Sequence, residues 1–337
     1  MPHRRRTGER EGPGDRTGGI GRNVGLGLIY IGLGLTSAWV WSLLADVQAL
    51  PRWHMEMVLG DAPAPNQYRP LTPWLAEGLA RVLSGGVSQP TLALFYAYLL
   101  LRGVVTGIGL LYFDRYLRTW FTGAAAAAGA LCLAAVLPFT YQRVVQESDP
   151  INLLVFVLAF WAIAKERDLL LIPLVAVGTL NRETTAMIPA LYLLARWGQR
   201  PTREIAWKTA AIGGAWVVVY GVLRLAYGGR EYYCDVMMWS QNWSAWVPTV
   251  RVLLVFGALW VLALLGARAG GPAMLRRALW LVPPYVALHY VVAKADEVRL
   301  FLPLAPILIP LSWWVLFPET RMGTGERQSR RSDGTQR

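Results

Sequence analysis

Long apolar runs separated by short polar segments dominate the sequence, and a helical run of roughly 20 residues can cross a bilayer once. The strongest run extends from Asn23 to Ala45, and similar runs predict seven further crossings. These lie at residues 90–112, 119–138, 151–164, 209–227, 249–267, 278–293 and 300–316. The segments 1–22 and 318–337 are basic and lack apolar periodicity, so we expect disordered tails. The pattern predicts an all-α polytopic protein with a transmembrane domain over residues 23–317.

One more apolar run, from Leu169 to Ala195, carries the polar sequence Asn-Arg-Glu-Thr at its middle, residues 181–184. If this run crossed the bilayer once, Arg182 and Glu183 would each cost several kcal/mol where they faced lipid. The alternative is a pair of half-helices that return to their own side and carry the polar residues at their tip.

The distribution of basic residues favours the hairpin, because cytoplasmic loops of membrane proteins are enriched in Lys and Arg. With residues 169–195 turned back on themselves, 22 of the 33 Lys and Arg residues, including those of both tails, fall on one side. A complete crossing would place the basic loop 196–208 and the C-terminal tail outside. We therefore predict about eight crossings plus one re-entrant hairpin, with both termini cytoplasmic. Richness in Arg, Ala and Gly indicates a bacterial source, so we expect the bacterial inner membrane.

Composition agrees with this topology, since 55% of the 337 residues are hydrophobic and 16% are charged. The net charge of +12 comes from Arg residues spread between apolar runs and not from one basic face. We therefore expect membrane lipids as partners and no nucleic acid. The two cysteines, Cys132 in an apolar run and Cys234 in a loop, indicate neither a disulfide framework nor a zinc site.

Polar groups gather in the loops of the predicted outer side. The first outer loop, residues 46–88, opens with Asp46 and contains Asp61 and Arg69, and its segment 74–83 has the pattern of an interfacial helix. The later outer loops contain Arg143, Glu147, Asp149, Arg230, Glu231, Asp235, Lys294, Asp296, Glu297 and Arg299. Because these loops share one side with the hairpin tip, we expect carboxylates and cations from separate loops to meet there.

The order of these features resembles the GT-C superfamily of integral-membrane glycosyltransferases. The resemblance rests on an acid after the first span, Ser-Asp-Pro at 148–150, Gly-x-Leu-Asn-Arg-Glu-Thr at 178–184, and Lys294, Glu297, Arg299 and Phe301 late in the chain. Members of that family transfer a sugar from a polyprenyl-phosphate donor at the outer face of the membrane. The resemblance therefore implies a polyprenyl-phosphate sugar as donor and a lipid-linked or envelope glycan as acceptor.

The resemblance also implies roles for single residues. Asp46 matches the family's first-loop acid, a general base or metal ligand, and Asp149 matches the acid of the second loop. The planar guanidinium of Arg suits phosphate. We expect donor-phosphate contacts from Arg69, Arg182, Lys294 and Arg299, supported by Glu183, Glu297 and Asp61. Asp46 and Asp149 are also the candidate ligands for Mg²⁺ or Mn²⁺. The family's acidic pair after the first span is single here, which leaves metal dependence open.

Other functions and structural roles stay open at the level of the sequence. Broken helices and intramembrane charges also occur in transporters and lipid flippases, whereas a non-catalytic scaffold would need none of the loop acids. Asp149 before Pro150 also fits a helix N-cap, and Arg182 with Glu183 could form a structural pair. Replacing Asp46 would separate these functions, because only the enzyme requires a base.

Overall fold

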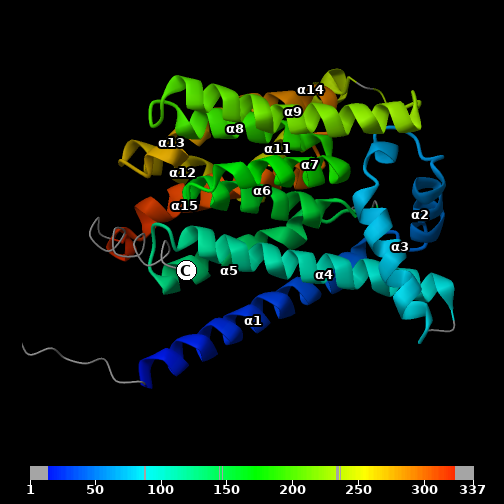
Figure 1. Ribbon diagram of the computed structural model, residues 1–337, viewed down its shortest axis with the longest axis horizontal. Coiled ribbons are helices and arrows are strands. Elements are labelled where there is room, and N and C mark those ends of the chain that lie inside the picture. The colour runs from blue at the N-terminus through cyan, green and yellow to red at the C-terminus, as the bar shows by residue number, and fades with distance from the viewer. Residues whose placement is uncertain are drawn as a thin grey trace, which may run out of the picture.

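The computed structural model describes residues 14–86, 89–143, 145, 147–232, 235 and 237–322, with side chains described from residue 24 onward. This part of the chain forms a helical bundle whose long helices run along the longest dimension of the molecule (Figure 1). It contains no strand within those residues, only two isolated bridges, Ala64 to Tyr232 and Phe121 to Arg321. The prediction of an all-α protein is confirmed.

Five helical segments in the described part of the chain have the length and apolar composition needed to cross a membrane. They are Val24–Leu44 within α1 (Gly14–Leu44), α4 (Pro90–Leu117), α5 (Gly123–Val136) with η2 (Leu137–Thr140), α9 (Thr202–Tyr227), and η6 (Val298–Leu304) with α15 (Ala305–Leu316). A sixth span results if α11 (Trp246–Phe256) and α12 (Leu259–Arg268), which meet at 58°, count as one bent helix. The short helix α10 (Trp239–Ser244) precedes that pair.

Two of the eight predicted crossings do not have this length. Residues 151–164 belong to α6 (Asp149–Ala164), which has 16 residues. Residues 278–293 begin at the last residue of α13 (Ala273–Ala278) and comprise mainly η5 (Leu279–Leu281) and α14 (Val282–Val292). α6 is apolar on all sides and mostly buried, as expected of a helix surrounded by other helices. Eight full-length crossings are therefore not confirmed, because an apolar run alone does not distinguish a lipid-exposed helix from a buried one.

The two ends of the described chain lie at the same end of the bundle (Figure 1). α1 begins at Gly14, inside the segment where we expected a disordered tail. Residues 318–322, at the start of the second expected tail, are also placed, since η7 (Pro318–Thr320) ends next to Met322, whose backbone N–H donates to Trp120 O at 2.9 Å. The rest of both predicted tails lies outside the described residues.

The predicted first outer loop forms a cap of short helices across the opposite end of the bundle (Figure 1). It consists of α2 (Leu50–Leu59), η1 (Asn66–Tyr68) and α3 (Leu71–Ser84). The predicted interfacial helix lies within α3, which exposes Trp74, Leu75 and Val82 and buries Ala76 and Ala80. Large exposed apolar side chains on this helix agree with a position at a membrane surface.

The broken run does turn back on itself. It contains η3 (Asp168–Leu170), α7 (Leu171–Asn181), η4 (Glu183–Ala186) and α8 (Met187–Arg196). At the base of the hairpin, Arg196 near the end of α8 donates to Asp168 just before α7 at 2.6 Å, and to Ile163 O at 2.7 Å. Lys208 Nζ also lies 3.2 Å from Asp168. These contacts hold the start of α7 near the end of α8, so the polar tip between the two halves lies at the other, capped end.

Candidate functional site

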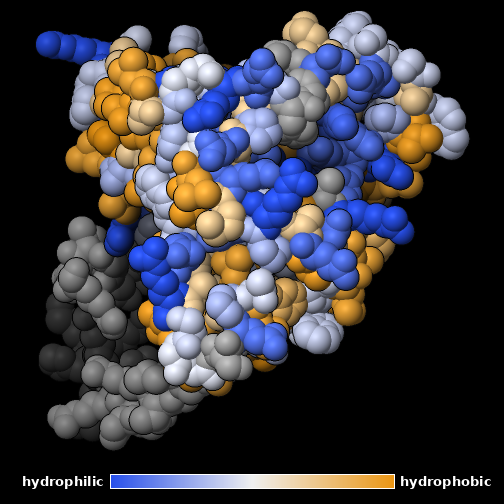
Figure 2. All heavy atoms as spheres, turned by 90° about the vertical axis from the view of Figure 1, so that its right-hand side faces the viewer, coloured by the Kyte–Doolittle hydropathy of each residue, from blue (hydrophilic) through white to orange (hydrophobic). Residues whose placement is uncertain are grey.

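A cavity of about 1050 Å³ opens at the capped end of the bundle. Its walls come from the end of α1, the cap around η1, the loop before α6, the hairpin tip, α9 and the segment from α14 to η6. Figure 2 looks onto this end and shows hydrophilic side chains gathered in its middle. Segments far apart in the sequence therefore meet around one chamber.

Charged side chains of both signs line this cavity, as the sequence predicts for the outer loops. The lining cations among the described residues are Arg69, Arg143, Arg182, Lys294 and Arg299. The lining acids in the same part of the chain are Asp46, Glu147, Glu183, Asp235 and Glu297. The structure thus brings together Asp46, all four predicted phosphate-binding cations, and the two supporting acids from the hairpin tip and the last loop.

The hairpin tip projects into the cavity because its polar groups find partners at the end of the bundle. Arg182 has an extended backbone, with φ −162° and ψ 136°, and this ends the helix α7. The side chain of Asn181 donates to Ser148 O at 2.8 Å and accepts a hydrogen bond from Thr72 Oγ1 at 2.7 Å. Trp216 Nε1 donates to Glu183 O at 3.0 Å. Polar backbone within an apolar run is tolerated when protein groups satisfy it in this way.

Asp149 lies behind the cavity wall and is held between two arginines. It is 5% exposed, and its carboxylate accepts a hydrogen bond from Arg182 Nη1 at 2.5 Å and from Arg299 Nη1 at 3.1 and 3.2 Å. Arg299 Nη2 also donates to Glu297 at 2.7 Å. Asp149 therefore orients two guanidinium groups, a role that differs from both the catalytic acid and the helix N-cap considered from the sequence.

Arg182 and Arg299 each have one N–H group without an acceptor among the described residues. The Nε atoms of Arg182 and Arg299 are buried and have no hydrogen-bond partner among the described residues, although both residues line the cavity. A buried donor without a partner costs about 1–3 kcal/mol, and more when the group is charged. Anionic oxygen atoms are strong acceptors for guanidinium groups, so an anionic ligand suits the cavity wall that Arg182 and Arg299 form.

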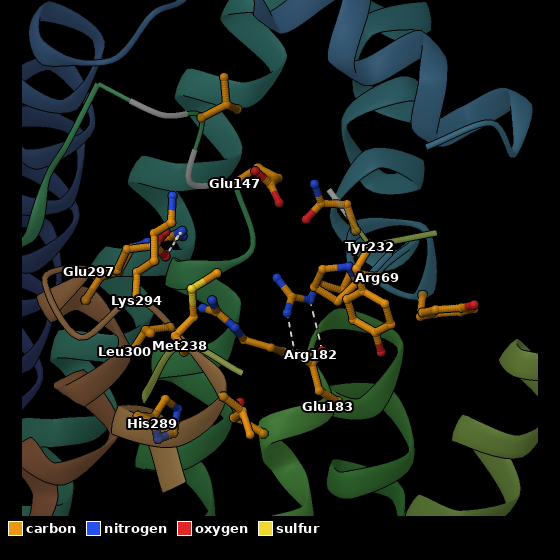
Figure 3. Close-up of a pocket in the computed structure, with 18 of the residues that line it drawn as sticks. Arg69, Glu147, Arg182, Glu183, Tyr232, Met238, His289, Lys294, Glu297 and Leu300 are labelled. Carbon is orange, nitrogen blue, oxygen red and sulfur yellow. Dashed lines mark hydrogen bonds and ion pairs between the residues drawn. The ribbon is translucent and has the colours of Figure 1, made fainter. Parts of the chain in front are cut away.

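A separate ion pair, between Arg69 and Glu183, joins the cap to the hairpin tip at the cavity. Arg69 Nε donates to Glu183 Oε2 at 2.9 Å, and its Nη2 contacts the other oxygen of that carboxylate. Figure 3 shows this pair near Tyr232, with Lys294 and Glu297 on the far side of Arg182. The bidentate geometry fixes the position of the hairpin tip relative to the cap.

Three carboxylates in the cavity lining form no ion pair with a described cation: Asp46, Glu147 and the exposed Asp235. Asp46 is exposed, and its backbone N–H donates to Arg143 O at 2.6 Å. Glu147 is half-buried and comes from the loop before α6, above Arg182 in Figure 3. Burial raises the pKa of the Glu147 carboxyl above its ordinary value of 4.5, with the nearby Asp149 charge acting in the same direction and Arg299 and Arg69 opposing it. A carboxyl group with a raised pKa suits proton transfer.

The residues do not fit a carboxylate metal site. Asp149 is committed to two arginines and does not line the cavity, so it cannot share an ion with Asp46 in this arrangement. The described part of the chain contains no group of three or more His, Cys, Asp and Glu residues placed to hold a metal. Asp61, predicted as a supporting acid, is exposed and lies outside the cavity lining.

The wall formed by η1 and α9 is aromatic, a feature that the search for charged motifs missed. Tyr68, Tyr220 and Tyr232 all line the cavity. The guanidinium of Arg224 lies 4.0 Å from the centroid of the Tyr68 ring and donates to the Tyr220 and Tyr232 hydroxyls at 2.6 and 2.9 Å. The bridge between Ala64 and Tyr232 and the hydrogen bond from Arg224 bring the last tyrosine here, and both contacts depend on tertiary structure.

Comparison with known proteins finds no relative: no family model matches the chain, and neither do any curated protein sequences or solved structures. Arguments about function therefore depend on the geometry of the cavity.

Proposed function

We propose that this protein is an integral-membrane glycosyltransferase that moves a sugar from a polyprenyl-phosphate donor to a lipid-linked or envelope glycan acceptor. The proposed location is the outer face of a bacterial cytoplasmic membrane. One observation carries the proposal: Arg182 and Arg299, whose buried Nε atoms have no hydrogen-bond partner among the described residues, line the same cavity as a half-buried carboxylate. The first can hold a phosphate and the second can accept the proton of a hydroxyl group.

The phosphate of the donor would bind at Arg182 and Arg299, with Lys294 beside them. Asp149 holds both guanidinium groups in place, so their orientation does not depend on the ligand. When the bond between sugar and phosphate breaks, a phosphodiester with one negative charge becomes a phosphate monoester with two. The arginines therefore stabilise the departing phosphate more than the bound donor, which is the condition for catalysis by electrostatic stabilisation.

Glu147 would act as the general base. Its carboxylate takes the proton from the acceptor hydroxyl, whose oxygen forms a bond with the anomeric carbon of the sugar. The bond from that carbon to the phosphate oxygen breaks, and its electron pair leaves with polyprenyl phosphate. We assign the base to Glu147 and not to Asp46, because Glu147 is the less exposed of the two. Asp46, at the exposed side of the cavity, would bind hydroxyl groups of the acceptor.

The cavity also offers an apolar side for a substrate with a lipid chain. Leu288 and Val292, one helical turn apart on α14, line the cavity and are 45% and 46% exposed. Met187 and Met238 line it as well. Apolar side chains that face both a cavity and the outside of a membrane protein fit a lipid-linked substrate better than a water-soluble nucleotide sugar.

Mass spectrometry of lipid-linked and envelope glycans tests the proposal. Cells that lack the gene should lack one hexose or pentose, and the wild-type gene should restore it while the Glu147→Gln variant does not. A Glu56→Gln variant is the matched control, because Glu56 is an acid of the neighbouring cap that does not line the cavity. Unchanged glycans in the deletion strain would contradict the proposal, and a defect in solute or lipid transport alone would favour a transporter.

A further inference from the structure

Glu147 borders a second and much smaller cavity, which it shares with Tyr98, Arg102 and Thr72. The volume of this cavity is about 10 Å³, close to the lower limit for a single water molecule. Tyr98 is 2% exposed, so its hydroxyl is screened from bulk solvent. Glu147 therefore lies between the large cavity and a small enclosed space that the Tyr98 and Arg102 side chains also border.

A chain of hydrogen bonds leads from Tyr98 to the surface of the cap. The Tyr98 hydroxyl lies 3.0 Å from Nδ1 of His54, and Nε2 of His54 lies 3.0 Å from Oε2 of Glu77. His54 is only 1% exposed, whereas 30% of the Glu77 side chain is accessible to solvent. A buried imidazole with both ring nitrogens in hydrogen bonds can pass a proton from one side to the other.

We propose that Tyr98, His54 and Glu77 form a proton path that returns Glu147 to its ionised form after each sugar transfer. This inference rests on the function proposed above. Protonated Glu147 gives its proton, through a water molecule in the small cavity, to the Tyr98 oxygen as the Tyr98 proton moves to His54 Nδ1. The Nε2 proton of His54 moves to Glu77, which releases it to solvent. One proton leaves the site, and no group is oxidised or reduced.

The charges around the path favour this direction. Arg102 lines the small cavity, and its guanidinium carbon lies 4.7 Å from the Trp41 ring centroid and 4.9 Å from that of Tyr141. This fixed cation stabilises the carboxylate that remains when Glu147 loses its proton. At the other end, the hydrogen bond from His54 lowers the pKa of Glu77, with Arg81 acting in the same direction. Glu77 is therefore ionised at neutral pH and can accept the proton.

The same hydrogen bonds also tie α2, α3 and α4 together, so a loss of stability alone does not test the path. The decisive comparison is between the first turnover and the steady state. Glu147 is ionised before the first transfer and needs the path only afterwards. The variants Glu77→Gln and Tyr98→Phe should therefore keep the wild-type rate in a single turnover. Their steady-state kcat should fall roughly tenfold, with KM unchanged and a larger solvent isotope effect in heavy water.

The assay uses the full chain in liposomes and a polyprenyl-phosphate hexose or pentose that the wild type consumes. Glu56→Gln is the matched control, because Glu56 pairs with Arg52 as Glu77 pairs with Arg81, one helical turn apart, and lies outside the path. This control should retain the wild-type steady-state rate. The path is overturned if both test variants match the control in the steady state, or if the first turnover slows as much as the steady state. A wild type that consumes no donor would instead refute the proposed function.

Discussion

Asp149 holds the two arginines of the charged cavity wall, so its replacement by Asn should lower the stability of the protein. The change removes a buried negative charge that binds Arg182 at 2.5 Å and Arg299 at 3.1 and 3.2 Å. Removing one partner of a buried ion pair costs about 3–5 kcal/mol. Because one carboxylate serves two cations here, we expect Asp149→Asn to lower the free energy of unfolding by about 5 kcal/mol, the upper end of that range.

Equilibrium unfolding in mixed detergent micelles measures this change. Asp296→Asn is the matched control, because Asp296 is partly exposed and lies 3.5 Å from Arg251, and surface pairs contribute about 0–1 kcal/mol. Adding Arg182→Met to Asp149→Asn should recover roughly 1 kcal/mol or more, since it removes one of the unpaired cations. The reasoning is refuted if Asp149→Asn costs no more than Asp296→Asn.

Three further predictions concern the base, the phosphate site and the packing of the bundle. Glu147→Gln should lower kcat by roughly 10²–10⁴. The wild type should transfer sugar at its full rate at high pH and lose activity as the pH falls through a midpoint above 4.5, because only the ionised carboxylate accepts a proton. Arg299→Lys keeps the charge but loses the planar fork, so isothermal titration should show donor affinity reduced roughly tenfold or more. Gly107→Ala should destabilise the protein by about 1–3 kcal/mol in detergent unfolding, because its Cβ would lie 2.7 Å from the Ile31 Cα, whereas Gly109→Ala should be tolerated since nothing lies within 4 Å.

The sequence predicts the hairpin and the meeting of charges at its tip, and the reason is physical. Arg182 and Glu183 cannot face lipid in the middle of an apolar run, so the chain must either turn or bury them. The structure contains the turn, and Arg69 from the cap pairs with Glu183. Loops from separate runs line one cavity with the tip; the side of the membrane on which they lie stays a prediction of the positive-inside rule.

The sequence does not distinguish Asp149 from Glu147, which are only two residues apart. Burial separates their roles: Asp149 lies against two arginines behind the wall, whereas Glu147 faces both cavities. Nor does the sequence report that His54, in α2, contacts Tyr98 in α4, because that contact depends on how the cap folds over the bundle. The crossings at 151–164 and 278–293 differ from expectation for a related reason, since short apolar helices can be buried entirely by their neighbours.

Release of polyprenyl phosphate from defined donors in liposomes tests the central claim most directly. Purified protein would be mixed with a panel of polyprenyl-phosphate hexoses and pentoses and an extract of lipid-linked glycans as acceptor, and the lipids analysed by mass spectrometry. The wild type and Glu56→Gln should convert at least one donor to polyprenyl phosphate and a larger glycan, while Glu147→Gln should not. Equal release by the wild type and Glu147→Gln, or no release from any donor, would contradict the account.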